Sequence, residues 1–367
     1  MLRRYFQADS LSLQHWEVQA LFYAQIVGGT EGLFHIKGEV LIAGESRSWT
    51  MVVKLIAAES DPAIASTWFY AQREALAYKS LILDTMTGVL SAPKCYGITL
   101  CQNSKIWLWL ENVIADEPPL WTINCYANAA FGLGEAAALL QPQLFKIRDT
   151  PLTYSFASSW CKYWFRWYGL SSVDSVRRIT SAQSYVSARQ LQNVLQLLEE
   201  AGSLIEQYHL MPQTFCHHDT HRLNLIIQKK TKPFARIVAV DWALAGPGPV
   251  GADAADLVSG SLLNFCFDMQ QAEFLELQVM TRYLDGLYST QWQGDPKKVE
   301  AGYLLQTVLR FEALVPVWLA HWLSKKETEA TQRRFNLTEQ QIAETWVALL
   351  DFVIERRERL VRLLPLL

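Results

Sequence analysis

The sequence FCHHDTHRLNLII occupies residues 215–227, and the apolar run VAVDW follows at residues 238–242. The first stretch comes after a long helical pattern and leads into a short apolar strand, so its polar centre is predicted to be a loop. The second stretch ends an apolar strand with a carboxylate. Loop and strand end together make Asp219, Asn224 and Asp241 candidate functional residues.

Oxygen-bearing side chains in this pattern suit phosphoryl transfer. A transferred phosphoryl group needs a divalent cation and a cationic side chain to hold its charge, and a hydroxyl nucleophile needs an acceptor for its proton. Mg²⁺ prefers oxygen ligands, usually including one or two carboxylates. Asp219, the amide oxygen of Asn224 five residues later, and Asp241 offer such oxygens.

The cationic side chain is expected from the N-terminal part of the chain. Lys54 lies inside the apolar run VVKLI, and burying its charge alone is costly, so it needs a partner. Glu74, on a helical stretch predicted from residue 62 to about residue 83, is the natural partner. Apolar runs rich in β-branched or aromatic residues predict strands at residues 20–28, 33–43, 49–57, 94–101 and 105–111.

The length of 367 residues suggests two lobes. A linker at residues 112–119 separates the strands from a helical region. We therefore expect a small antiparallel α+β N-lobe over residues 1–112, a larger, mostly helical C-lobe over residues 113–367, and ligand binding between them. The expected helices of the C-lobe cover residues 127–141, 155–168, 182–208, 269–287, 299–324 and 338–363.

Composition excludes several classes of protein. Half of the residues are hydrophobic and 19% are charged, which excludes a disordered chain, and the net charge of −3 argues against a basic nucleic-acid binder. The most apolar run, from Tyr303 to Leu323, is interrupted by Arg310 and Glu312, so no membrane span is expected. The basic run at residues 356–362 is predicted to be the solvated face of a terminal helix.

The N-terminus has no secretory signal pattern, and the six cysteines include no CxxC pair. Reduced thiols and a cytoplasmic location are the simplest expectation.

Two segments together carry a resemblance to a known family. HHDTHRLN at residues 217–224 and VDWALAGPGPVGADAADL at residues 240–257 resemble the aminoglycoside phosphotransferase / choline kinase-like family of small-molecule kinases. That family shares the bilobal protein-kinase fold, and its loop typically reads H-G-D-x-x-x-x-N before a strand that ends in Asp. The resemblance runs from a glycine loop at residues 28–32 to about residue 260.

The resemblance implies an ATP- and Mg²⁺-dependent transfer of the γ-phosphoryl group to a hydroxyl of a small molecule. Asp219 is similar to the catalytic acid that accepts the hydroxyl proton, and Asn224 and Asp241 look like the Mg²⁺ ligands. Lys54, paired with Glu74, looks like the lysine that reaches the α- and β-phosphates.

Further positions follow from the same resemblance. Gly28, Gly29 and Gly32 would belong to the turn that covers the phosphates. Glu111 lies where backbone groups would meet the adenine, and Asp253 resembles an acid that braces the catalytic loop. The sequence departs from the family pattern at His218, which replaces the usual glycine, and in the loop GGTEG, which is not G-x-G-x-x-G.

Other interpretations stay open at this point. The histidines around Asp219 could belong to a metal-dependent hydrolase, although that chemistry would need more ligands. The chain could also be a catalytically silent nucleotide-binding member of the same fold. Lys54 could face water at a strand edge, Glu74 could pair within its helix, and His221 could be structural or lie near phosphate.

The phosphoryl acceptor is not identified by the sequence. Trp164, Trp318 and Trp322 could line a pocket that holds an amine by cation–π attraction, or they could be core residues. Residues 241–300 contain nine acids and three bases, which would suit a cationic acceptor such as an aminoglycoside or amino-alcohol, or form a solvated face. A sugar is a further candidate, and ATP is not distinguished from GTP.

Overall fold

The computed structural model describes residues 1–21, 29–58, 61–101, 105–116, 121–167, 185–228, 236–323, 332 and 336–367. Of residues 62, 166, 167 and 320–323 it describes the backbone only.

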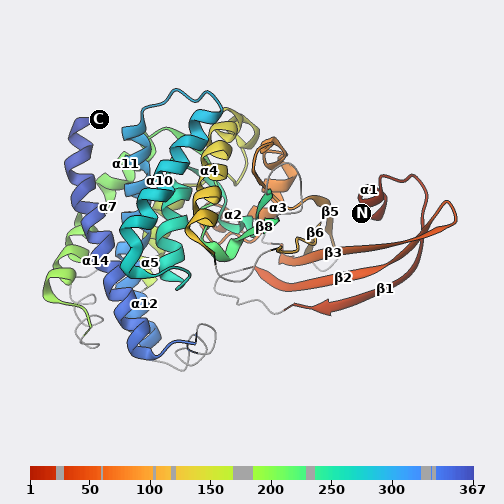
Figure 1. The fold of residues 1–367 in the computed structure, drawn as a ribbon, viewed down its shortest axis with the longest axis horizontal. Coiled ribbons are helices and arrows are strands. Elements are labelled where there is room, and N and C mark those ends of the chain that lie inside the picture. Colours follow the sequence, from red (N-terminus) through yellow and green to blue (C-terminus); the bar gives the residue numbers. More distant parts are fainter. Residues whose placement is uncertain are drawn as a thin grey trace.

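The N-terminal part forms a five-stranded antiparallel sheet at one end of the molecule (Figure 1). Its strands, in the spatial order β1-β2-β3-β6-β5, are β1 (Ser12–Ala20), β2 (Thr30–Ile42), β3 (Glu45–Ala57), β6 (Lys105–Glu111) and β5 (Cys95–Leu100). The strand at residues 12–20 was not predicted, and the strand expected at 20–28 falls mainly on residues 22–28, which are outside the described part. The nine residues of β1 are all exposed, so this edge strand lacks the buried apolar run on which the prediction depended.

The two faces of β3 have different surroundings because side chains alternate along a strand. Met51 and Val53 face a small cluster closed by the short helix α1 (Leu2–Phe6). Ile56 belongs instead to the main core, together with residues of α3 (Arg73–Lys79). Lys54 shares that inner face, so its amino group is directed toward the helical part of the molecule.

The C-terminal part is mostly helical and lies on the other side of the molecule from the sheet (Figure 1). Its longer helices are α4 (Ile123–Leu140), α5 (Phe156–Trp167), α7 (Ala188–Leu210), α10 (Ala272–Ser289), α11 (Pro296–Thr307), α12 (Leu314–Leu323) and α14 (Glu339–Leu363). The α7 and α14 helices each begin with a reciprocal capping box, Ser187 with Gln190 and Thr338 with Gln341.

Two predicted helices are interrupted. The stretch from residue 62 to 83 forms α2 (Pro62–Ala65) and α3, with a turn between them. The stretch from 299 to 324 is divided into α11 and α12 by a π-helical turn, η7 (Val308–Glu312). Periodicity alone does not reveal a π turn, because it adds one residue without ending the apolar pattern.

Short strands frame the loop at residues 217–224. β7 (Gln213–Cys216) pairs with β10 (Gly246–Pro249), and β8 (Leu225–Gln228) pairs with β9 (Arg236–Ala239). The β9 strand also pairs in parallel with β4 (Leu90–Ser91) from the N-terminal half. The loop and the end of β9 are therefore held next to each other.

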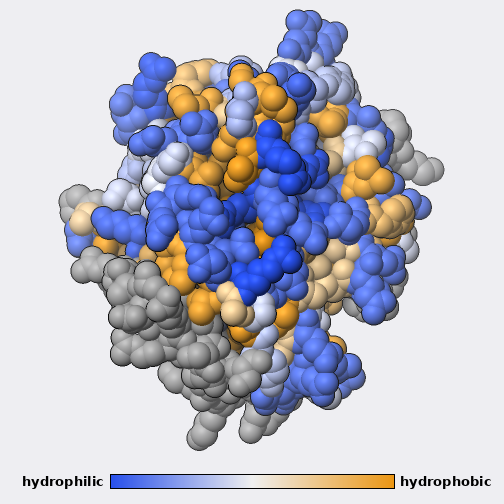
Figure 2. Space-filling model, turned by 90° about the vertical axis from the view of Figure 1, so that its left-hand side faces the viewer, coloured by the Kyte–Doolittle hydropathy of each residue, from blue (hydrophilic) through white to orange (hydrophobic). Residues whose placement is uncertain are grey.

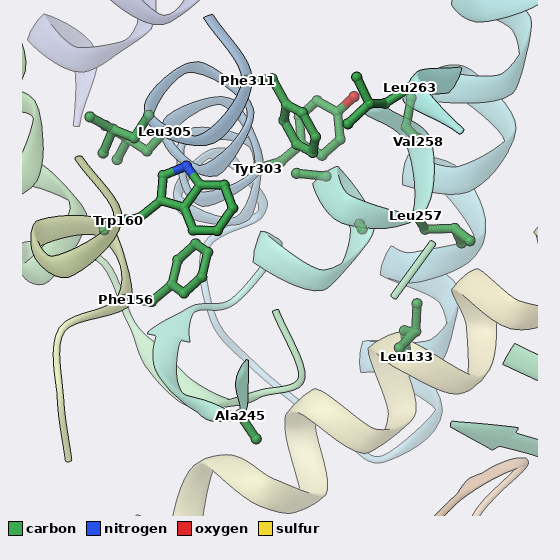
Figure 3. Packing of buried hydrophobic residues seen from close by; sticks show 14 of the residues in the cluster. Leu133, Phe156, Trp160, Ala245, Leu257, Val258, Leu263, Tyr303, Leu305 and Phe311 are labelled. Carbon is green, nitrogen blue, oxygen red and sulfur yellow. The ribbon is translucent and has the colours of Figure 1, made fainter. Parts of the chain in front are cut away.

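The main core lies among the helices, as the buried aromatic and aliphatic side chains of Figure 3 show. The α4 and α10 helices pack closely because each has a glycine at the contact. A Cβ atom on Gly134 would lie 2.0 Å from the Tyr283 carbonyl oxygen, and one on Gly286 would lie 2.0 Å from that of Phe131. Only glycine allows the two backbones to come this close.

The surface at the helical end is largely hydrophilic with scattered apolar residues (Figure 2). The prediction of a solvated basic face on the terminal helix is wrong for two of its arginines. Arg356 and Arg357 are each 4% exposed, and they bind carboxylates of neighbouring helices, Arg356 that of Glu276 and Arg357 that of Glu312. No helix in the described ranges is both long and apolar enough to span a bilayer.

Candidate active site

Lys54 joins the two parts of the molecule. Its Nζ lies 2.6 Å from Glu74 Oε2 and 2.6 Å from Asp241 Oδ1. Burial opposes the charge on Lys54, but the two carboxylates outweigh it and raise the lysine pKa. Glu74 also accepts from the Trp242 N–H at 3.3 Å. The predicted Lys54–Glu74 pair is thus present in the structure, and Asp241 completes it from the C-terminal part.

Asp241 is held in an unusual backbone conformation. Its φ and ψ are 64° and 66°, in the left-handed region that few non-glycine residues adopt. Its side chain is 49% exposed although it is bonded to a buried lysine. Trp242 anchors the turn, since its indole N–H donates to the Ala239 carbonyl and its ring packs 4.5 Å from that of His217. The buried tryptophan therefore directs the preceding carboxylate outward.

Asp219 and Asn224 are in direct contact. Asn224 Nδ2 donates to Asp219 Oδ2 at 2.8 Å and to the Asp219 carbonyl at 2.9 Å. His221 Nε2 lies 3.5 Å from the same Oδ2. Burial raises the pKa of Asp219, but His221 and Arg310 lower it more strongly, so it ends well below the usual range of a carboxyl group. The loop presents an ionised carboxylate.

The base of this loop is fixed by backbone contacts. Asp253 accepts the N–H groups of His217 at 3.0 Å and His218 at 2.9 Å. His217 Nε2 lies 2.9 Å from the Val240 carbonyl oxygen, which links the loop to the end of β9. Thr220 Oγ1 donates to the Asp253 carbonyl. The contacts of Asp253 are those of a residue that braces the loop.

Sequence reasoning missed Arg310. Its Nη2 lies 2.7 Å from Asp219 Oδ1, and its Nη1 lies 2.9 Å from Asp256 Oδ2 and donates to the His218 carbonyl. The side chain is only 9% exposed. A signal was present in the sequence, because an arginine inside an otherwise apolar helix needs a buried partner.

The positions predicted to bind the nucleotide lie along the sheet. Gly29 has a φ of 96°, and a Cβ there would lie 2.1 Å from that of Ala71, so the loop packs tightly against the segment before α3. Gly32 lies in β2 next to a bulge, and Gly28 is outside the described residues. The Glu111 carboxylate accepts two hydrogen bonds from Arg236, at 2.6 and 2.9 Å. The backbone N–H of Glu111 donates to the Lys94 carbonyl.

The structure separates the candidate acceptor-binding residues. His221 lies beside Asp219, as described above. Trp164 is 7% exposed and packs on Trp68, with ring centroids 6.0 Å apart. Trp318 packs against Trp346 of α14 at 5.9 Å. The Trp322 side chain is outside the described part.

The acids of residues 241–300 have partners within the fold. Asp268 and Asp295 cap helices, and Asp285 binds Arg282. Glu273 and Glu276 bind Arg356, and Glu300 binds Arg359. With Asp253 bonded to the loop and Asp256 to Arg310, Asp241 is the acid of this segment that lies exposed at the site.

Residues 133–292 match the model of the phosphotransferase enzyme family. A search of curated proteins found no match. The matched segment contains Asp219, Asn224 and Asp241, and the match confirms the predicted resemblance to a phosphotransferase family.

Solved structures with the same fold include three kinases of small molecules. An amicoumacin kinase in complex with AMP-PNP, Ca²⁺ and Ami is 13% identical, with 90% of each chain covered and a TM-score of 0.55. A Plasmodium vivax ethanolamine kinase is 13% identical over 92% of this chain and 81% of that chain, with a TM-score of 0.50. An aminoglycoside phosphotransferase from Alicyclobacillus acidocaldarius is 12% identical over 95% of each chain, with a TM-score of 0.50. The predicted bilobal protein-kinase-like fold is thereby confirmed.

Proposed function

We propose that this protein is an ATP- and Mg²⁺-dependent kinase that transfers the γ-phosphoryl group to a hydroxyl of a small molecule. The observation that carries the proposal is the position of Lys54, bonded at 2.6 Å to both Glu74 and Asp241 where sheet and helices meet. A lysine held in this way presents a fixed positive charge for phosphate oxygens. The family match supports phosphoryl transfer as the reaction class.

Asp219 orients the acceptor hydroxyl and takes up its proton. The lowered pKa keeps the Asp219 carboxylate ionised, and Oδ1 is bonded to Arg310. Oδ2 accepts one hydrogen bond from Asn224 and lies 3.5 Å from His221, so its remaining lone pair would receive the hydroxyl proton. A weak base is sufficient here, because phosphoryl transfer depends mainly on positioning and on stabilisation of charge.

The residues fit a magnesium ion bound together with the nucleotide. The Asp241 carboxylate is half exposed, and Asn224 uses its Nδ2 for Asp219, which leaves its Oδ1 as a ligand. When bound, Mg²⁺ would neutralise phosphate charge. No three His, Cys, Asp or Glu side chains in the described ranges form a metal-binding group, and a zinc hydrolase would require one.

The nucleotide would lie along the sheet, with Gly28, Gly29 and Gly32 over the phosphates and the backbone near Glu111 at the adenine. An amicoumacin kinase of the same fold was solved with AMP-PNP, which supports ATP as the donor. The acceptor site would lie beside His221. Trp164 packs on Trp68 and Trp318 on Trp346, so the proposal does not depend on ring contacts from them. Because the acids of residues 241–300 have partners within the fold, Asp241 included, an acidic lining does not favour a cationic acceptor over a sugar.

The test is a thermal-shift and ADP-release screen with Mg-ATP against aminoglycosides, amino-alcohols, sugars and macrolides. We expect Mg-ATP to raise Tm and one acceptor class to release ADP. D219N is the matched variant, and it should lose turnover while keeping the Mg-ATP shift. Binding of Mg-ATP without turnover on any acceptor would favour the catalytically silent alternative. Bound zinc without an Mg-ATP shift would favour the hydrolase.

A further inference from the structure

Arg310 occupies a buried position behind Asp219. Its guanidinium bonds Asp219 Oδ1 at 2.7 Å and the carbonyl of His218, so it contacts both the carboxylate and the backbone of the loop. Its central carbon lies 5.4 Å from the Phe156 ring and 5.1 Å from the Trp160 ring. These two rings are stacked side by side on α5 (Figure 3). Arg310 therefore has little freedom to move.

A second layer of polar groups holds Arg310 from behind. Asp256 Oδ2 lies 2.9 Å from Arg310 Nη1, and Asp256 itself is 1% exposed. Gln306 Nε2 donates to both Asp256 oxygens, at 3.2 and 3.1 Å, and Gln306 Oε1 accepts the Tyr208 hydroxyl at 3.0 Å. The chain of contacts from Tyr208 to Asp219 crosses the helical part through buried side chains.

Both charged members of this network lie in π-helical turns. Arg310 lies in η7, and Asp256 begins η5 (Asp256–Gly260). A π turn inserts one residue into a helix and changes the direction of the side chains around it, and such turns are frequent at functional sites. Glu312, the last residue of η7, binds Arg357 of α14 at 2.9 Å, so the turn is held by a second ion pair.

We propose that Arg310 is the positioning residue of Asp219, and that Asp256 and Gln306 hold its guanidinium in place. The inference rests on the proposed function, since it gives Asp219 the role of facing the acceptor hydroxyl. Arg310 fixes the Oδ1 side of the carboxylate and Asn224 binds Oδ2, so the acceptor hydroxyl would approach the remaining lone pair of Oδ2. The planar fork of arginine reaches Asp219, Asp256 and the loop carbonyl together, and the single ammonium of a lysine cannot.

The test compares R310K and R310A with R356A. Arg356 is also buried and bound to carboxylates, but its partners are Glu273 and Glu276, away from the loop. We expect R310A to lower kcat by about 100-fold while KM for Mg-ATP is unchanged, because a displaced carboxylate impairs only the positioning of the acceptor. R310K should show a smaller loss of kcat than R310A. Added guanidinium should restore part of the activity of R310A and should not change the activity of R356A.

Stability gives a readout that needs no activity. D219N, R310K and the double variant are compared by Tm, and we expect the two single losses not to add, because both changes disrupt one contact. Additive losses would show that Arg310 and Asp219 do not stabilise each other, whether or not the protein is a kinase. An R310K variant with wild-type kcat would overturn the positioning role while leaving the kinase intact. If the wild type shows no turnover but the Tm losses are not additive, the proposed kinase activity is wrong and the Arg310–Asp219 contact is supported.

Discussion

His218 shows how one backbone angle explains a departure from the family pattern. The residue has a φ of 60°, a conformation in which glycine is the usual choice. Two contacts of the imidazole offset the strain of this backbone conformation. The ring stacks on that of Phe156 with centroids 4.4 Å apart, and its Nε2 lies 3.2 Å from the Pro247 carbonyl oxygen. These two contacts hold a histidine at a position where the family pattern has glycine.

The buried ring predicts a pH dependence. Burial, with a smaller effect of Arg310, lowers the pKa of His218 to about 3, whereas an unfolded histidine titrates near about 6.5. The stabilisation from neutral His218 is complete above about pH 6.5 and declines as the pH falls toward the folded pKa. We expect H218N to be less stable than wild type at about pH 8, and the gap in Tm to narrow toward about pH 4.

The comparison with wild type is necessary because other groups act in the opposite sense. Burial raises the pKa of Asp256 and of Glu312 to about 7, and these carboxyls favour the folded state at lower pH. H15Q, which changes an exposed histidine on β1, serves as the control for loss of a histidine outside the core. A Tm gap for H218N that stays constant with pH would show that His218 does not titrate on unfolding.

At the scale of elements, the crossing of α4 and α10 determines where the core helices lie. The two helices meet at Gly134 and Gly286, whose absent side chains allow carbonyl oxygens of the partner helix to approach. Another helical glycine, Gly202 of α7, faces open space, with no atom within 4 Å of the place that an added methyl group would take. The same substitution should therefore have opposite effects in the two helices.

We expect G134A to destabilise the protein by roughly 1–3 kcal/mol, because the new methyl group forces the helices apart. G202A should stabilise it by about 0.5–1 kcal/mol, because alanine loses less backbone entropy in a helix. Denaturant unfolding measures both. Equal effects of the two substitutions would mean that the close approach at Gly134 is relaxed at little cost.

For the whole molecule, charged groups form part of the contact between the sheet and the helical part. Lys54 and Glu74 from the N-terminal part meet Asp241 from the C-terminal part, and the Glu111–Arg236 pair joins β6 to β9. Glu74 is 1% exposed, so it depends on Lys54 for most of its charge compensation. The same lysine is therefore needed for stability and, in the proposed function, for the phosphates.

Two variants separate these roles. K54M should lower stability by about 3–5 kcal/mol, because it leaves the Glu74 carboxylate buried without its cation. K54M/E74L removes both charges and should recover much of that stability, yet neither variant should show an Mg-ATP shift in Tm. K37M, at an exposed lysine paired with Glu17, is the control and should behave as wild type in both measurements. An Mg-ATP shift retained in K54M would contradict the phosphate role.

The sequence determined those features of the protein that depend on short spacings. Asp219 and Asn224 are five residues apart in one loop, so their contact follows from local geometry. The charge of Lys54 within an apolar strand required a partner, and Glu74 was the acid on the next helix. The order of strands and helices, with these motifs, was enough to predict the bilobal class.

Only the tertiary structure decided the contacts between distant segments. Arg310 lies 91 residues from Asp219, and its reach depends on a π turn that apolar periodicity does not reveal. The edge strand β1 was not predicted because exposed residues carry no burial signal, and Arg356 was taken for a surface residue because its acidic partners lie on another helix. Long-range packing creates these environments, and no short stretch of sequence contains them.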